Sequence, residues 1–146
     1  MFTKSVRVLY AGLAWLWVVG LLAQVFLVGL ALFDKRSYWE AHMGLGHLIG
    51  LLPLLFVLLS FLGRFTRRDK GLAALVFGVY FVQVDVFAGI RSTAPGWIVA
   101  FHPVLAFALL ALSLALAQRA RGTLRGAAVA APASLVALGA VGQGVS

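Results

Sequence analysis

Long apolar runs separated by short charged clusters are the dominant pattern of the chain. Four runs, at residues 8 to 33, 38 to 62, 71 to 90 and 96 to 118, reach the roughly 20 helical residues needed to cross a hydrocarbon core of about 30 Å. Loops at that depth would leave backbone groups without hydrogen bonds, and the runs are too uniformly apolar for barrel strands. The pattern therefore predicts an all-α integral membrane protein, a bundle of four transmembrane helices.

Two polar segments indicate where the second and fourth helices begin. The sequence Ser37-Tyr38-Trp39-Glu40 fits a capping box, in which Ser37 and Glu40 pair with N–H groups that would otherwise be unpaired. Pro95 is tolerated in a first helical turn because its missing N–H would have no partner there. Trp39 and Trp97 then lie at the same end of the bundle, which is typical of an aromatic belt at a membrane surface.

The distribution of positive charge predicts the orientation. Cytoplasmic loops carry an excess of Lys and Arg, and an internal N-terminus places nine of the twelve on that side. These nine are Lys4, Arg7, Arg64, Arg67, Arg68, Lys70, Arg119, Arg121 and Arg125, whereas Lys35, Arg36 and Arg91 lie outside. We expect an N-in, C-in, multi-pass protein of the bacterial plasma membrane.

Composition narrows the function classes. The chain is 63% hydrophobic and 11% charged, with a mean hydropathy of +1.05, far more apolar than a soluble domain. Its net charge of +8 comes from clusters between apolar runs, which argues against a nucleic-acid partner. The sequence has no Cys. Any metal or cofactor would therefore have to be held by His, carboxylate or Met side chains. Motifs of hydrolases, phosphate loops and zinc proteases are missing, which makes soluble enzymology the least expected class. Any enzymatic activity is expected to be redox chemistry of the cytochrome b type.

The end of the chain differs from the rest. Residues 126 to 146 carry no charge and are rich in Ala, Val and Gly, with a Pro at position 132. We expect residues 1 to 125 to form the transmembrane domain. The apolar C-terminal tail is expected to be loosely ordered or to lie on the surface, with a weak fifth helix as the alternative.

The first two runs resemble the last two, which predicts two repeated helical hairpins. The first run ends with Gln24 followed by Gly29, and the third ends with Gln83 followed by Gly89. The second and fourth runs each open with Trp and then carry His-x-x-Leu followed by a small residue, at His42 with Gly46 and at His102 with Ala106. Repeated hairpins commonly create a shared site in membrane folds.

Four ionisable residues fall inside the apolar runs, where they are costly and usually functional. They are His42, His47, Asp85 and His102. At 1.5 Å per residue, all four are expected in the outer third of the membrane. Two imidazoles on different helices at one depth are typical of axial haem ligation in a bundle.

The haem hypothesis assigns roles to particular residues. His42 and His102 are the expected iron ligands of a haem b, with His47 as the alternative, and the small residues Gly46 and Ala106 leave room for a flat macrocycle. Arg91, together with Lys35 and Arg36, lies at the right level to pair with propionate carboxylates.

Three segments carry a resemblance to known families. Residues 24 to 29, 42 to 47 and 96 to 106 resemble a family of small bacterial four-helix membrane proteins of unknown function. They are also similar to four-helix b-type cytochromes and to one half of haem A synthase, over roughly residues 8 to 120. The resemblance implies that His42 and His102 match haem-ligand positions. Glu40 corresponds loosely to an acidic residue that precedes a ligand in the synthases. Met43 replaces the usual Arg of the synthases and their second half-bundle is missing, so the resemblance implies haem binding rather than synthase activity.

The expected function is therefore electron transfer by a membrane haem protein, with a quinone or a larger respiratory protein as partner. Two alternatives stay open at this point. The chain could be a non-enzymatic accessory or scaffold subunit whose polar residues join helices, acting with a membrane partner or as a homo-oligomer. It could also be a small transporter or metal-binding bundle, with Asp85 and Gln83 as proton-relay candidates.

Overall fold

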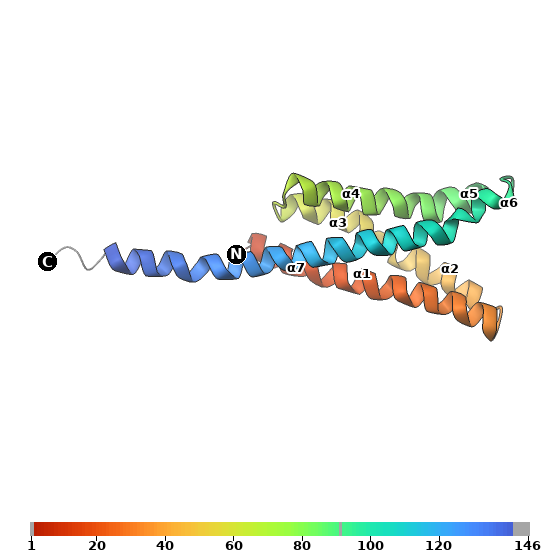
Figure 1. The fold of residues 1–146 in the computed structure, drawn as a ribbon, viewed down its shortest axis with the longest axis horizontal. Coiled ribbons are helices and arrows are strands. Elements are labelled where there is room, and N and C mark those ends of the chain that lie inside the picture. Colours follow the sequence, from red (N-terminus) through yellow and green to blue (C-terminus); the bar gives the residue numbers. More distant parts are fainter. Residues whose placement is uncertain (1, 91, 142–146) are drawn as a thin grey trace.

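The computed structural model describes residues 2–90 and 92–141, with side chains described for 2–87, 89, 90 and 92–125. Within these residues the chain is helical and has no strand, which confirms the all-α prediction, and it forms four rods joined by short turns (Figure 1). The first rod is α1 (Phe2–Phe33), and the second consists of α2 (Tyr38–Ile49) and α3 (Leu51–Leu62). The third consists of α4 (Arg67–Phe81), the π-helix η1 (Val82–Val86) and α5 (Phe87–Ile90), and the fourth of α6 (Gly96–Val99) and α7 (Phe101–Val141).

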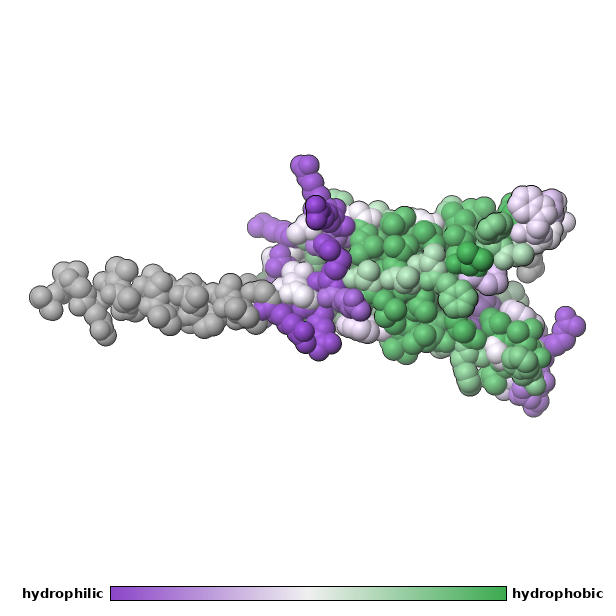
Figure 2. Space-filling model, viewed as in Figure 1, coloured by the Kyte–Doolittle hydropathy of each residue, from purple (hydrophilic) through white to green (hydrophobic). Residues whose placement is uncertain are grey.

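Among the described residues, three helical segments are long and apolar enough to cross a membrane, namely Phe2–Phe33, Tyr38–Leu62 and Gly96–Arg125. The predicted third span, 71 to 90, is helical but is divided among α4, η1 and α5. Figure 2 shows a broad hydrophobic band between two hydrophilic ends. These features indicate a membrane protein, whereas the orientation and the repeat of the two hairpins stay predictions.

Two prolines account for the interruptions of the second and fourth rods. Pro53 has no N–H to donate to the Ile49 carbonyl, and Pro103 has none for the Val99 carbonyl. Each interruption falls one residue after the released carbonyl, at Gly50 and at Ala100. The two long rods therefore bend locally at positions set by their prolines.

The start of α2 shows that the capping-box prediction is wrong. Ser37 has a helical backbone conformation (φ −61°, ψ −20°), and its side chain makes no capping hydrogen bond. The reason is that turn carbonyls already accept from the first N–H groups, including Tyr38 N–H to Lys35 and Glu40 N–H to Ser37, both at 3.1 Å. α4 begins differently, because the Thr66 side chain accepts a hydrogen bond from the Asp69 N–H at 3.2 Å.

The fourth rod continues past the expected domain boundary. α7 extends without a break through Val141, so residues 126 to 141 have a helical backbone where composition favoured a loosely ordered segment. This part of α7 extends beyond the other rods, at the end of the bundle where the N-terminus lies (Figure 1). The division into a domain and a separate tail at residue 125 stays a prediction.

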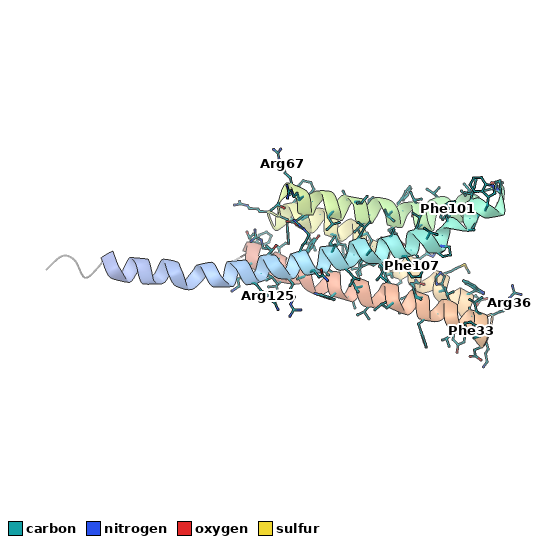
Figure 3. All side chains as sticks on the ribbon, in the orientation of Figure 1. Phe33, Arg36, Arg67, Phe101, Phe107 and Arg125 are labelled. Carbon is teal, nitrogen blue, oxygen red and sulfur yellow. The ribbon has the colours of Figure 1, made fainter. Side chains whose placement is uncertain are left out.

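The four rods form a square in cross-section. α1 packs against α3 and α7, and α4 also packs against α3 and α7, so α1 lies diagonally opposite α4, and α3 diagonally opposite α7. The two hairpins pack closely at the end that carries Arg67 and Arg125, and less closely at the end that carries Phe33 and Arg36 (Figure 3). We call these parts the closed half (residues 2–18, 51–80 and 109–125) and the open half (residues 19–50, 81–90 and 92–108).

Trp17 is the centre of the closed half. Its side chain is fully buried and its Nε1–H donates to the Ser113 hydroxyl of α7 at 2.8 Å. Its ring also makes edge contacts with Phe56 of α3 and Tyr80 of α4, at centroid distances of 6.4 and 5.6 Å. One indole thus contacts the three other rods and fixes their spacing.

Candidate cofactor site

A cavity of about 320 Å³ lies between the two hairpins, mainly in the open half. Its lining is mostly apolar and comes from α1, α2, α4, η1 and α7. Val25 and Phe107 line it although 52% and 69% of their surfaces are exposed, so the cavity reaches the outer face of the bundle. Figure 2 shows the bundle divided into two lobes at this end. A volume of this size is typical of small-molecule sites.

His42 and His102 both line this cavity. They come from α2 and α7, which belong to diagonally opposite rods, and both side chains are half-buried. Their ring centroids are 6.4 Å apart and the ring planes make an angle of 68°. The structure therefore brings together the two histidines that the sequence singled out.

The His42 ring is held by two neighbours. Its Nδ1 lies 3.2 Å from the Gln24 carbonyl oxygen, and the edge-to-face contact with Trp39 has a centroid distance of 5.7 Å. Because a carbonyl only accepts, this contact favours the tautomer with a proton on Nδ1. Nε2 then keeps its lone pair, as a metal ligand requires.

His102 is held mainly through its backbone. The Gln83 amide donates from Nε2 to the His102 carbonyl oxygen at 2.9 Å, and the Phe87 ring lies 6.2 Å from the imidazole. The His102 imidazole also has the backbone of Gln83 as a hydrogen-bond partner. Both imidazoles therefore meet the backbone of a glutamine on a neighbouring rod.

Two glutamine oxygens in the cavity wall are buried without a partner among the described residues. They are the Oε1 atoms of Gln24 on α1 and Gln83 on η1. These two elements are on the other diagonal of the bundle, so His42, His102, Gln24 and Gln83 face the cavity from its four sides. An unpaired buried acceptor is costly and uncommon, so each of these oxygens calls for a donor such as a water molecule or a ligand.

Small side chains widen the cavity where the sequence predicted room. Gly46 and Ala106 both line it, on α2 and α7. The Tyr80 hydroxyl donates to the Gly46 carbonyl oxygen at 3.0 Å, which joins α4 to α2 one helical turn after His42. A side chain at Gly50 would collide with the same hydroxyl.

Several predicted site residues lie elsewhere. His47 is exposed on the outer face of α2, where its Nδ1 lies 2.8 Å from the Met43 carbonyl, and it does not line the cavity. Asp85 is also exposed and away from the cavity, although Gln83 lies two residues before it. Arg91, the expected propionate partner, lies outside the described residues. Within the described part of the chain, no cluster of three or more His, Asp or Glu residues could hold a bare metal ion.

Sequence reasoning missed part of the cavity wall. Trp39 was expected in a surface belt but contacts His42, and neither Trp17 nor Tyr80 was singled out. Helical spacing could have found them. Trp17 precedes Gln24 by seven residues and Tyr80 precedes Gln83 by three, intervals that place side chains on one helix face.

Comparison with known proteins identifies one similarity. Residues 24–89 match the model of a family of unknown function (DUF6220). The match includes His42, Gln24 and Gln83, and it ends before His102. No curated protein and no solved structure matches the chain. The finding supports the expected similarity to a small family of unknown function, whereas the resemblance to b-type cytochromes and to haem A synthase stays a prediction.

Proposed function

We propose that the chain is a membrane haem protein in which His42 and His102 ligate the iron of a haem b and which carries electrons within the membrane. The observation that carries this proposal is the separation of the two imidazole rings across a mostly apolar cavity. It combines donor chemistry, distance and space at one position between the two hairpins.

The ring separation fits two imidazoles on opposite sides of one metal ion. A metal–imidazole bond is about 2.0–2.1 Å, and the ligating nitrogen lies about 1.2 Å from the ring centre, so the two ring centres would be roughly 6.4–6.6 Å apart. The rings of His42 and His102 are 6.4 Å apart. Neutral imidazoles in a mostly apolar cavity are the usual axial ligands of haem in helical bundles.

Other residues support ligation without touching the metal. The Gln24 carbonyl orients the His42 ring, because it accepts the proton of Nδ1 and leaves Nε2 available as a ligand. Trp39 and Phe87 limit the rotation of the two rings through aromatic contacts. The apolar residues around them exclude water, which influences the reduction potential of a haem bound there.

A haem bound here would supply reversible one-electron transfer. The exposed rim at Val25 and Phe107 places the cavity next to lipid, which suits a quinone or a membrane protein as the electron partner. We further propose that the end with Lys4, Arg67 and Arg125 faces the cytoplasm of a bacterial cell, since most Lys and Arg residues gather there. The cavity then lies towards the outer face of the plasma membrane.

The test is an absorption spectrum of the detergent-purified protein after expression with ample haem. We expect a Soret band and resolved α and β bands on reduction for the wild type. His42→Ala and His102→Ala should each lose this spectrum. His47→Ala is the matched control, because it removes an imidazole from the same helix outside the cavity, and it should keep the spectrum. A folded, colourless wild-type protein would disprove haem binding.

A structural role is the second candidate, and specific contacts favour it. The bonds from His42 to Gln24 and from Gln83 to His102 each join two helices, as expected of a scaffold subunit. In that case His42→Ala should weaken folding or assembly while no variant changes a cofactor spectrum. The same set of variants therefore separates the two functions.

A further inference from the structure

We infer that the end of the bundle that carries Arg67 and Arg125, here called the basic end, is a binding surface for anionic lipid headgroups. Its Lys and Arg side chains come from α1, from the turn after α3, from α4 and from α7. The partner is the phosphate group of an acidic phospholipid in the surrounding bilayer. This surface lies away from the cavity and does not depend on haem binding.

Charge is divided unequally between the two ends of the bundle. Nine of the twelve Lys and Arg residues belong to the basic end, together with a single carboxylate, Asp69. The remaining three cations are balanced by three carboxylates at the other end, Asp34, Glu40 and Asp85. The whole net charge of +8 therefore belongs to the basic end, and its electrostatic partner is an anion.

The fold itself uses few of these cations. Arg119 pairs with Asp69 at 2.6 Å. Arg7 donates to two backbone carbonyl oxygens after α3, at 2.9 and 3.3 Å. Six other cationic side chains are exposed and form no hydrogen bond or ion pair with the described residues. These six are Lys4, Arg64, Arg67, Arg68, Arg121 and Arg125.

Two of the six lie where the helix disfavours positive charge. Arg67 and Arg68 belong to the first turn of α4. The unpaired N–H groups of a first helical turn carry partial positive charge, so a carboxylate such as Asp69 is favourable there and an arginine is not. The stability of α4 therefore does not explain the two arginines, whereas an external anion would offset their charge.

The basic end also lies at the level of lipid headgroups. Figure 2 shows hydrophilic side chains gathered where the hydrophobic band ends, and Arg67 and Arg125 extend outward at this end in Figure 3. The Lys70 Nζ lies 4.5 Å from the centre of the Phe61 ring, which is 60% exposed, as is typical of a lysine at a membrane interface. Clusters of about four to eight Lys and Arg residues beside a membrane span are typical of binding to acidic lipids.

The test measures the lipid preference of the purified protein in vesicles. Electron paramagnetic resonance compares spin-labelled phosphatidylglycerol with spin-labelled phosphatidylcholine and separates lipids held at the protein from mobile lipids. At low salt we expect the acidic lipid to associate about two- to fivefold more strongly. In 1 M NaCl, where the Debye length is about 3 Å, this ratio should approach one. Equal association of the two lipids at low salt would overturn the inference.

Two pairs of substitutions locate the preference at the basic end. Arg67→Gln with Arg68→Gln, and Arg121→Gln with Arg125→Gln, each remove two exposed cations without a partner among the described residues. Each pair should lower the ratio by up to about twofold. Replacement of chloride by inorganic phosphate at equal ionic strength should leave the ratio unchanged. Loss of the preference in phosphate would assign the surface to free phosphate and contradict the role of lipid.

The matched control is Lys35→Gln with Arg36→Gln, which removes two exposed cations from the opposite end. Its lipid ratio should equal that of the wild type, and a loss as large as in the basic-end pairs would overturn the inference. The salt titration of the wild type needs no variant, so a pair that fails to fold does not prevent the test. None of the substituted residues lines the cavity, so all these proteins should share one haem spectrum, and failure of the two proposals is distinguishable.

Discussion

The two halves of the bundle use the same kinds of residues in different ways. In the closed half, Trp17 donates to Ser113 and packs against Phe56, so both the polar and the apolar groups of this layer are paired. In the open half, the Oε1 atoms of Gln24 and Gln83 have no hydrogen-bond partner among the described residues, and both side chains line a cavity of about 320 Å³. The comparison teaches that tight packing is confined to the closed half, whereas the open half has the space and the polar groups that the proposed binding site requires.

The largest difference is expected between two tryptophans. Trp17→Ala should lower the free energy of unfolding by about 3–5 kcal/mol, because it leaves a void among three rods and removes the donor to Ser113. Trp39→Ala in the open half should cost no more than about 1 kcal/mol, because Trp39 is 36% exposed beside the cavity. Denaturant unfolding in detergent measures both. Equal losses would mean that the halves are packed alike.

A pair of glycine substitutions tests the boundary between the halves. A methyl group at Gly50 would collide with the Tyr80 hydroxyl, so Gly50→Ala should destabilise the protein by about 1–3 kcal/mol. Gly44→Ala on the same rod meets nothing within 4 Å and should be neutral or slightly stabilising. Thermal unfolding of the two variants checks this, and a neutral Gly50→Ala would show that Tyr80 moves aside freely.

Removal of one polar side chain should stabilise the open half, whereas removal of one polar side chain from the closed half should destabilise the protein. In the cofactor-free protein, Gln24→Leu should raise the free energy of unfolding by about 1 kcal/mol, because it removes a buried acceptor that lacks a donor. Ser113→Ala in the closed half should have the opposite sign, since it leaves the Trp17 N–H unpaired. A destabilised Gln24→Leu protein would show that the amide is already paired in solution.

The smallest effect is expected at the charged end of the closed half. Asp69 accepts from Arg119 and from the Thr66 hydroxyl, both at 2.6 Å. Partial burial alone would raise the pKa of Asp69, but the hydrogen bonds from Thr66 and Arg119 and the positive charge of Arg119 hold this pKa below its usual value. Arg119 is 48% exposed, so Asp69→Asn should cost only about 0.2–1 kcal/mol at neutral pH.

The pH dependence of that difference follows from the lowered pKa. The carboxylate contributes its full stability above the unfolded-state pKa of about 3.9, and the contribution is lost as the pH falls through the lower folded-state pKa. The wild type and Asp69→Asn should therefore converge in strongly acidic solution and differ at pH 7. Unfolding curves at several pH values check this, and a constant difference would contradict it.

The sequence was sufficient to predict where the helical rods begin and end, but not which side of each rod faces the core. Helices end at Phe33 and Leu62, where the apolar runs end, because charged residues cannot continue into hydrocarbon. Along each run, however, lipid-facing and core-facing residues are equally apolar, so periodicity does not show direction. Only polar residues indicate which side faces inward, which is why His42 and His102 could be paired from sequence. Trp17 and Tyr80 can be placed only through their helical spacing from Gln24 and Gln83.

Other features depend on contacts that a sequence does not display. His47 shares a depth with His42 but lies on the exposed face of α2, since five residues rotate a helix by more than one turn. The π-helical turn around Gln83 and the missing side-chain cap at Ser37 reflect the local backbone path. The unpaired glutamine oxygens become visible only when the neighbouring helices are in place.

Because His42 and His102 belong to different hairpins, any molecule ligated by both would clasp the two hairpins together at their weakly packed end. Ligand binding would then raise the free energy of unfolding, by about 2.7 kcal/mol when the free ligand is at 100 times its Kd. A cell short of the ligand would hold a chain whose outer end separates more readily and is degraded sooner. The abundance of this protein in the membrane would thereby follow the supply of what it binds.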